Sequence, residues 1–137
     1  MSFDPYIHFQ GNARAALEAY RDLFGGTLEM MTYAQMPEAP AEMQGSDLIL
    51  HATLRVGGRS LMASDFPPGM AGDPQKAVSI SHEAASEAEA RRIFAALGEG
   101  GAVIMEFQPT FWSDGFGMVK DRFGTHWMIS SPWRQPG

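Results

Sequence analysis

A repeated frame constrains this chain more than any other feature of its sequence. Residues 58–64 and 124–130 both read Gly, two variable residues, a large apolar residue, Met, a further apolar residue and Ser. A short β-like run, an amphipathic helix and further strand candidates precede each copy in the same order. Internal repetition of this kind is a signature of duplicated structure, so the sequence predicts two similar βαβββ modules.

The two predicted helices carry clear periodic signals. The first spans residues 12–24, with Asn12 as its N-cap and an apolar stripe at helical spacing. The second spans residues 86–97 and opens with Ser86 and Glu89 at the spacing of a capping box. Each helix is followed by a pair of glycines, which is typical of a helix end.

Eight strands complete the predicted modules. They are residues 5–9, 27–33, 48–56 and 60–64 in module one, and 77–81, 102–107, 116–120 and 126–130 in module two. Module one covers about residues 1–66, the linker about 67–75 and module two about 76–137. A chain of 137 residues with 45% hydrophobic content suits one domain. The expectation is therefore a single α+β domain whose sheets border a shared concave cavity, with the helices outside.

Alternation along the strands assigns side chains to the two faces of each predicted sheet. In residues 48–56 every even position is apolar and is expected to pack under the helix, which leaves His51 and Thr53 facing the concavity. The same rule places Met62 and Ser64 on the concave side of module one. His126, Met128 and Ser130 are the matching residues in module two. On the first strand, Ile7 and Phe9 are assigned to the cavity, and His8 to the helix layer or to an edge.

Composition excludes several classes of protein. The chain has no cysteine, no long apolar stretch and no basic start followed by an apolar run, so disulfides, a membrane span and a secretory signal are not expected. Its formal charge of −6 would repel a phosphate backbone, so nucleic acid is not an expected partner. The expected compartment is the cytoplasm.

Several separated motifs resemble the PhnB-like branch of the vicinal oxygen chelate (glyoxalase/bleomycin resistance/dioxygenase) superfamily. They cover nearly the whole chain: Pro5-Tyr-Ile-His-Phe-Gln-Gly11, Leu23-Phe-Gly-Gly26, His51-Ala, Leu61-Met-Ala-Ser-Asp65, Gly100-Gly-Ala-Val103, Thr110-Phe-Trp112 and Asp121-Arg-Phe-Gly-Thr-His-Trp-Met128. The resemblance implies paired βαβββ modules and commonly a dimer. It also implies a divalent metal held by His, Glu or Gln on the first and last strands of each module.

The positions that would carry that metal hold other residue types here. Carried across from the family pattern, they fall at Pro5, Met62, Met128 and Ser79, with Ser81 as the alternative to Ser79. A thioether is a soft ligand and does not suit the hard or borderline metals of this superfamily. No cofactor and no metal are therefore expected, and Met62 and Met128 are interpreted as apolar lining of the cavity.

Two histidines leave a catalytic interpretation open. His51 and His126 both face the predicted concavity, and either could act as a general acid or base, or could only supply polarity. Trp112 either closes the cavity mouth or packs a dimer. The predicted ligand-binding set is Ile7, Phe9, His51, Met62, Ser64, Ser79, Trp112, His126 and Met128.

Three functions from different classes follow. The first is a dimeric, metal-free protein that binds a small molecule. The second is a metal-dependent lyase, isomerase or dioxygenase with a rearranged set such as His51, His126 and Glu106. The third is an antibiotic-sequestering resistance protein. A methyltransferase label attached to this family is not favoured, because the glycine pairs 25–26 and 100–101 follow helices, whereas the common cofactor-binding turn precedes one.

Overall fold

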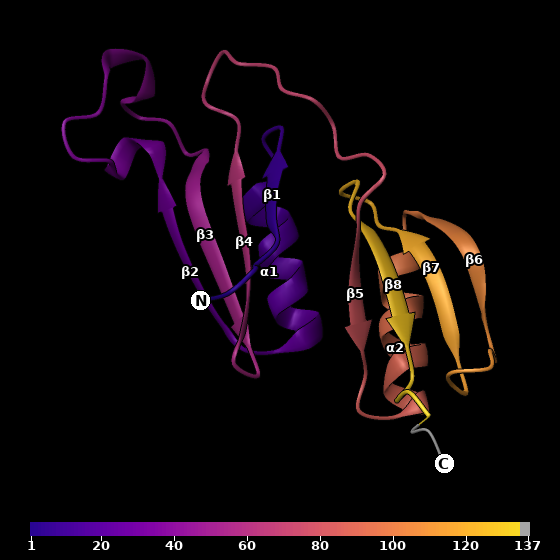
Figure 1. The fold of residues 1–137 in the computed structure, drawn as a ribbon. Coiled ribbons are helices and arrows are strands. Elements are labelled where there is room, and N and C mark those ends of the chain that lie inside the picture. Colours follow the sequence, from indigo (N-terminus) through magenta and orange to yellow (C-terminus); the bar gives the residue numbers. More distant parts are fainter. Residues whose placement is uncertain (135–137) are drawn as a thin grey trace. The chain divides into compact units, whose positions relative to one another are not determined.

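The chain folds as two compact units of the same construction. The structure, a computed structural model, describes residues 1–134 and divides them into unit one, Met1–Gln75, and unit two, which begins at Lys76. Each unit consists of one helix on one four-stranded sheet (Figure 1). The predicted α+β class, built from two βαβββ modules, is confirmed. A cavity shared by the modules stays a prediction.

Unit one contains a mixed sheet in the order β1-β4-β3-β2, in which only the β1–β4 pair is parallel. Its elements are β1 (Tyr6–Phe9), α1 (Ala13–Phe24), β2 (Thr27–Thr32), β3 (Ile49–Val56) and β4 (Arg59–Asp65). The long connection from β2 to β3 holds two short 3-10 turns, Tyr33–Gln35 and Ala41–Met43. The predicted strands of module one therefore exist, with ends shifted by one residue or less.

Unit two repeats this topology in the order β5-β8-β7-β6. Its elements are β5 (Ser79–Glu83), α2 (Glu87–Gly98), β6 (Ala102–Gln108), β7 (Phe116–Lys120) and β8 (His126–Ser130). The two copies of the repeated frame occupy equivalent places, since Gly58 and Gly124 each precede the last strand of a unit with positive φ angles of 78° and 94°. The repeat read in the sequence is thus a structural repeat.

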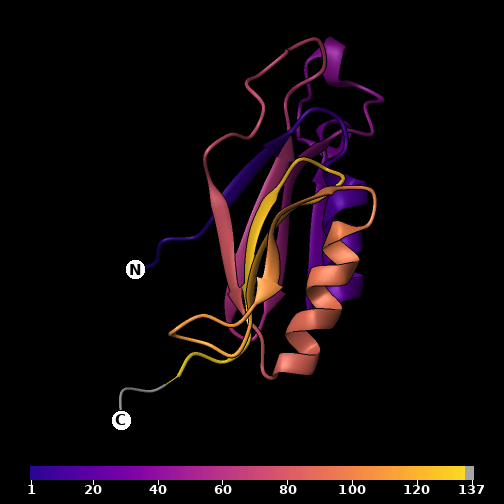
Figure 2. The ribbon, with the colours of Figure 1, turned by 90° about the vertical axis from the view of Figure 1, so that its right-hand side faces the viewer.

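Each helix covers one face of the sheet in its own unit, as α2 does in Figure 2. In unit one, Leu17 and Tyr20 of α1 are buried with Ala52 and Leu54 of β3, which confirms the alternation predicted for that strand. We call the opposite side of each sheet its distal face. No helix within residues 1–134 has the length and apolarity needed to cross a bilayer.

The N-terminus of α1 is capped by a residue far away in the sequence. Asn12 is the N-cap residue, as predicted, but its side chain makes no capping hydrogen bond within residues 1–134. Instead, Oδ1 of Asp65 accepts the N–H groups of Gly11 and Ala13, each at 3.0 Å, and Oδ2 accepts the N–H of Ile49 at 2.8 Å. Asp65 is 2% exposed. A buried carboxylate here satisfies free helix donors and complements the helix dipole.

The second helix begins at a local cap. The Oγ atom of Ser86 accepts the N–H of Glu89 at 3.1 Å, as predicted. The side chain of Glu89 pairs with Arg92 on the same helix, so only the serine half of the predicted capping box is observed.

His82 provides a pH-dependent contribution to stability. It pairs with Ile129 on the helix side of β5, and burial lowers the pKa of His82 below 6.5, although the nearby carboxylates of Glu89 and Glu83 oppose this shift. Because the folded state disfavours the imidazolium, this contribution is complete above 6.5 and is lost as pH falls from 6.5 towards the folded-state pKa. Urea unfolding at about pH 7.5 and about pH 5.5 should show a larger loss of stability in the wild type than in His82→Gln. Equal losses in the two proteins would remove His82 from the pH response.

Candidate functional site

Polar and aromatic side chains gather on the distal face of unit one. We call them the Tyr6 cluster: Tyr6, His8, His51, Thr53, Ser64 and Phe66. Strand pairing brings them together, because Tyr6 of β1 and Thr53 of β3 both lie opposite Met62 of β4, and His8 lies opposite Ser64. The cluster therefore spans three adjacent strands and is built within one unit.

Two imidazole–hydroxyl contacts organise the cluster. Nδ1 of His51 lies 2.9 Å from the hydroxyl of Tyr6, and Nε2 of His51 lies 2.9 Å from Oγ1 of Thr53. Both ring nitrogens of His51 are thus engaged by the fold. Nδ1 of His8 lies 3.1 Å from Oγ of Ser64, a side chain that is 6% exposed.

Four rings of the cluster form a continuous row. The ring centroids of His51 and Tyr6 are 5.5 Å apart, those of Tyr6 and His8 5.1 Å, and those of His8 and Phe66 5.4 Å. The interplanar angles are 36°, 33° and 23° along the row, so the first two pairs are tilted and the His8–Phe66 pair is stacked. Such a row fixes the planes of its rings.

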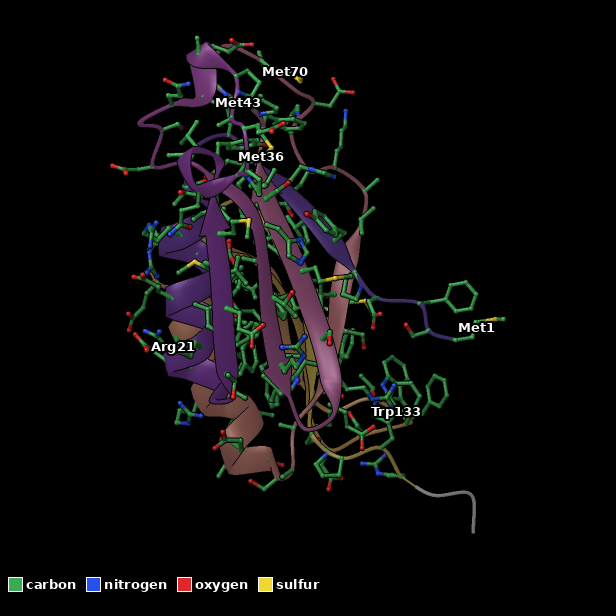
Figure 3. All side chains as sticks on the ribbon, turned by 90° about the vertical axis from the view of Figure 1, so that its left-hand side faces the viewer. Met1, Arg21, Met36, Met43, Met70 and Trp133 are labelled. Atoms are coloured by element: carbon green, nitrogen blue, oxygen red, sulfur yellow. The ribbon has the colours of Figure 1, made fainter. Side chains whose placement is uncertain are left out.

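The Phe66 end of the row is held by the chain that follows β4. A Cβ atom on Gly72 would stand 2.1 Å from Cζ of Phe66, so the backbone at Gly72 lies directly against the ring. Gln10 fastens this segment, donating to the carbonyl of Met70 at 2.8 Å and accepting from the N–H of Gly72 at 3.0 Å. Met70 lies at the same end of unit one as Met36 and Met43 of the β2–β3 connection (Figure 3).

The orientation predicted for the first strand was wrong. Ile7 lies opposite Ala63 and is 7% exposed, and Phe9 is 2% exposed, so both belong to the layer under α1 and not to the distal face. His8, assigned to the helix layer or to an edge, is exposed on the distal face with Ser64, on a strand that is the edge of its sheet. The alternation in the strand was enough to predict the correct orientation, because the apolar residues of an alternating strand normally face the buried layer.

Three of the predicted site residues are neighbours on the distal face of unit two. His126 of β8 lies between Ser79 of β5 and Lys120 of β7, and Met128 follows on the same face of β8. The Nδ1 atom of His126 is buried and has no hydrogen-bond partner among residues 1–134. A buried polar atom of this kind is costly unless water or a ligand satisfies it, so His126 stays a candidate.

Trp112 belongs to the lobe formed by the connection between β6 and β7. Its ring packs edge-on against Phe111, with centroids 4.9 Å apart, and against Phe116 at 5.3 Å. Arg134 holds the lobe by donating to the carbonyl of Thr110 at 2.8 Å and to Asp114 at 2.7 Å. Trp112 therefore borders the Phe116 end of the unit-two sheet, apart from His126 within the same unit.

Strand register shows which residues lie opposite Met62 and Met128, the two last-strand positions at which the sequence predicts metal ligands in the superfamily. Tyr6, one residue beyond the predicted Pro5, lies opposite Met62, and Ser81 rather than Ser79 lies opposite Met128. Neither unit gathers three or more His, Asp or Glu side chains in a group that could hold a metal ion, within the residues described. The alternative set of His51, His126 and Glu106 draws on both units and stays a prediction.

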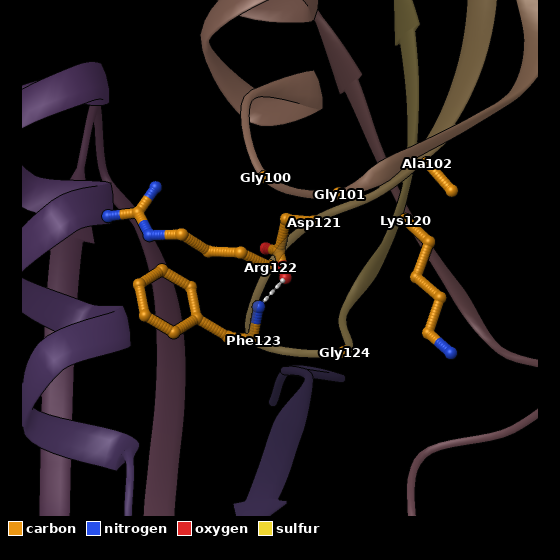
Figure 4. Close-up of a pocket in the computed structure, with 8 residues that line it drawn as sticks. All are labelled: Gly100, Gly101, Ala102, Lys120, Asp121, Arg122, Phe123 and Gly124. Atoms are coloured by element: carbon orange, nitrogen blue, oxygen red, sulfur yellow. Dashed lines mark hydrogen bonds between the residues drawn. The ribbon is translucent and has the colours of Figure 1, made fainter.

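A hollow of about 400 Å³ in unit two is not a candidate site. It is lined by residues 100–102 and 120–124. Its carboxylate, Asp121, is 4% exposed and accepts N–H groups from Phe123, Thr125 and the Trp127 indole at 2.9, 3.0 and 2.9 Å. Lys120 extends away from Arg122 (Figure 4), whose guanidinium lies 4.4 Å over the Phe123 ring. The hollow therefore does not focus charge on a ligand.

Comparison with known proteins decides the family. Residues 1–130 match the family described as 3-demethylubiquinone-9 3-methyltransferase. The chain belongs to this family. It is the PhnB-like family of the sequence resemblance, and the protein YjdN of Escherichia coli is 33% identical to this PhnB-like chain over 99% of both chains. Protein PA1353 of Pseudomonas aeruginosa is 46% identical, with a TM-score of 0.88 over 96% of this chain and 97% of that one.

More distant structures show the fold alone. The PhnB protein of Bacillus cereus superposes with a TM-score of 0.77 at 23% identity, over 96% of this chain and all of that one. The fosfomycin resistance protein FosX of Mesorhizobium loti superposes with a TM-score of 0.57 at 10% identity, over 96% of this chain and 91% of that one. The PhnB-like chain therefore has the glyoxalase/bleomycin-resistance-like fold.

Proposed function

We propose that this PhnB-like protein is a homodimer that binds a small molecule without a resident metal or other cofactor. The observation that carries the proposal is the Tyr6 cluster, in which two imidazole–hydroxyl contacts stand in a row of four rings. Ligand sites combine apolar and aromatic surface with a few fixed polar groups. The distal face of unit one has this composition, with Met62 beside Tyr6 and Thr53.

The composition of the metal positions supports binding over metal-dependent catalysis. The family pattern puts these positions at Pro5, Met62, Met128 and Ser79, with Ser81 as the alternative, and strand pairing lays Tyr6 opposite Met62 and Ser81 opposite Met128. None of them is the His, Glu or Gln that the superfamily uses there. Thioether sulfur is a poor ligand for divalent metals of that class.

The topology supports setting aside the methyltransferase activity in the family's description. Cofactor binding of the common kind uses a doubly wound parallel sheet and a glycine-rich turn that leads from a strand into a helix. Both sheets here are mixed and mainly antiparallel, with one parallel pair in each. The glycine pairs at 25–26 and 100–101 come after helices.

Exposed apolar side chains support self-association. On the edge strand β6, Val103, Ile104 and Met105 are 45%, 55% and 40% exposed, and Phe111 of the adjoining lobe is 87% exposed. An edge strand with apolar side chains is a favourable place for a second chain to cover. We place the dimer in the cytoplasm, in keeping with a sequence that has no cysteine.

Native mass spectrometry of protein purified without chelator tests the proposal directly. The expected spectrum shows a dimer without bound metal, with or without an added organic mass. About one divalent metal per chain would contradict the proposal and favour a metal-dependent lyase, isomerase or dioxygenase. A cationic antibiotic retained in the dimer would favour the sequestering function instead.

A further inference from the structure

His8 is the imidazole of the Tyr6 cluster that has capacity left for a ligand. Both nitrogens of His51 are occupied by Tyr6 and Thr53. His8 uses only Nδ1, towards Ser64, and its Nε2 makes no hydrogen bond within residues 1–134. His8 is also exposed, whereas Thr53 and Ser64 are 7% and 6% exposed. In an exposed imidazole of this kind, the hydrogen-bonded nitrogen orients the ring and the other nitrogen can form a hydrogen bond with a ligand.

The environment of Ser64 selects the tautomer of His8. The Ser64 hydroxyl has no partner except Nδ1 of His8 within residues 1–134. If Nδ1 carried the proton, the buried Ser64 O–H would have no acceptor, and an unmet buried donor costs more than an under-used acceptor oxygen. Ser64 therefore donates to Nδ1, and the proton of neutral His8 lies on Nε2. His8 then presents an N–H donor on the distal face.

The rings on either side hold that donor in place. Tyr6 and Phe66 flank the imidazole at centroid distances of 5.1 and 5.4 Å, and the backbone at Gly72 supports Phe66 from behind. A donor whose rotamer is fixed by packing loses little entropy on binding. The neighbouring rings also offer stacking surface to an aromatic ligand.

We propose that His8, oriented by Ser64, is the residue that recognises the ligand, and that the ligand is an aromatic small molecule carrying a carbonyl or carboxylate oxygen. The inference rests on the proposed function and names its ligand class. Nε2–H donates to the ligand oxygen, and the ligand ring lies against the exposed side of the Tyr6–His8–Phe66 row. His51 acts as a positioning residue that holds Tyr6.

Imidazole ¹⁵N spectroscopy with three simple probes tests the inference. Acetophenone carries a carbonyl oxygen, benzoate carries a carboxylate, and toluene has the ring alone. Free His8 should show the Nε2–H tautomer, and acetophenone or benzoate, but not toluene, should shift the His8 Nε2 resonance. Binding of benzoate in preference to acetophenone would identify a carboxylate ligand. Binding of acetophenone in preference to benzoate would identify a carbonyl.

Two variants separate recognition from structure. His8→Phe keeps the ring row and removes the donor, so affinity for the bound probe should fall about tenfold. Ser64→Ala should move His8 towards a mixture of tautomers and lower affinity about two- to fivefold, an effect that a purely structural serine would not produce. His82→Gln, which removes an imidazole from the helix side of another sheet, is the matched control and should bind as the wild type does. Backbone amide spectra establish that each variant is folded.

The outcomes distinguish this inference from the proposed function. If His8 carries its proton on Nδ1, or if none of the probes shifts His8, the inference is wrong, whatever mass spectrometry shows of a retained ligand. If the probes bind His8→Phe as well as they bind the wild type, the protein still binds small molecules but His8 does not recognise them. A dimer with one divalent metal per chain would overturn the proposed function, even if His8 had the expected tautomer.

Discussion

Asp65→Ala is expected to lower the free energy of unfolding by about 3 to 5 kcal/mol, because it leaves three backbone donors without their acceptor. The carboxylate joins the start of α1, the start of β3 and the end of β4 through the N–H groups of Gly11, Ala13 and Ile49. At 2% exposure, water cannot replace it without local opening. The measurement is urea unfolding followed by circular dichroism, with linear extrapolation to water.

Two further substitutions serve as controls for Asp65→Ala. Asp65→Asn keeps the size of the side chain but turns one acceptor into a donor. It should lower the free energy of unfolding by less than Asp65→Ala does, but still by about 2 kcal/mol or more. Asp22→Ala removes a carboxylate from the exposed end of α1, where the side chain is 72% exposed, and should change stability by no more than about 0.5 kcal/mol. Similar effects of Asp65→Ala and Asp22→Ala would refute the capping role of Asp65.

Gly26→Ala and Gly101→Ala are each expected to cost about 3 kcal/mol or more, because the new methyl group meets backbone that cannot move aside. A Cβ atom on Gly26 would stand 2.1 Å from the carbonyl oxygen of Arg55, and one on Gly101 would stand 2.1 Å from that of Lys120. Each glycine precedes the second strand of its unit and lies against the backbone of the third strand, so the same close contact occurs in both units. Thermal and urea unfolding of the two variants measure the cost.

Gly57→Ala separates the clash from the cost of a positive φ angle. Gly57 has a φ of +54°, and none of the described residues comes within 4 Å of a Cβ atom built there. Only the left-handed backbone conformation is then penalised, by about 1 kcal/mol. Gly57→Ala is therefore the control for Gly26, whose φ is +92°, and a Gly57→Ala variant as unstable as Gly26→Ala would show that close backbone approach is not what requires glycine at position 26.

Prediction from the sequence succeeded where a signal extended over many residues. The helices at residues 13–24 and 87–98 and the strands at 116–120 and 126–130 follow from periodicity and turn residues. Several residues in each of these elements follow the same periodic pattern, so one misread position does not change the predicted type of the element. The family resemblance, too, rested on several motifs in order, and the match over residues 1–130 confirmed it.

Prediction failed where one residue of register decided the result. The first strand has only four residues, Tyr6–Phe9, and the prediction assigned Ile7 and Phe9 to the wrong face. A shift of one residue exchanges every side chain of a strand between its faces. His51 and Ser64 lie on the predicted face because their longer strands alternate more clearly, whereas Tyr6 and His8, which belong to the candidate cluster, were not among the predicted site residues.

The sequence by itself determined the repeat, the class of each element and the family, because these depend on patterns that neighbouring residues carry together. Only the tertiary structure decided that Asp65 caps α1, since its partners Gly11 and Ala13 are more than fifty residues away in the chain. It also decided that, within residues 1–134, His8 has one ring nitrogen without a hydrogen bond, whereas both ring nitrogens of His51 are engaged. Such contacts depend on which strands become neighbours and in what register, and no local pattern in the sequence specifies either.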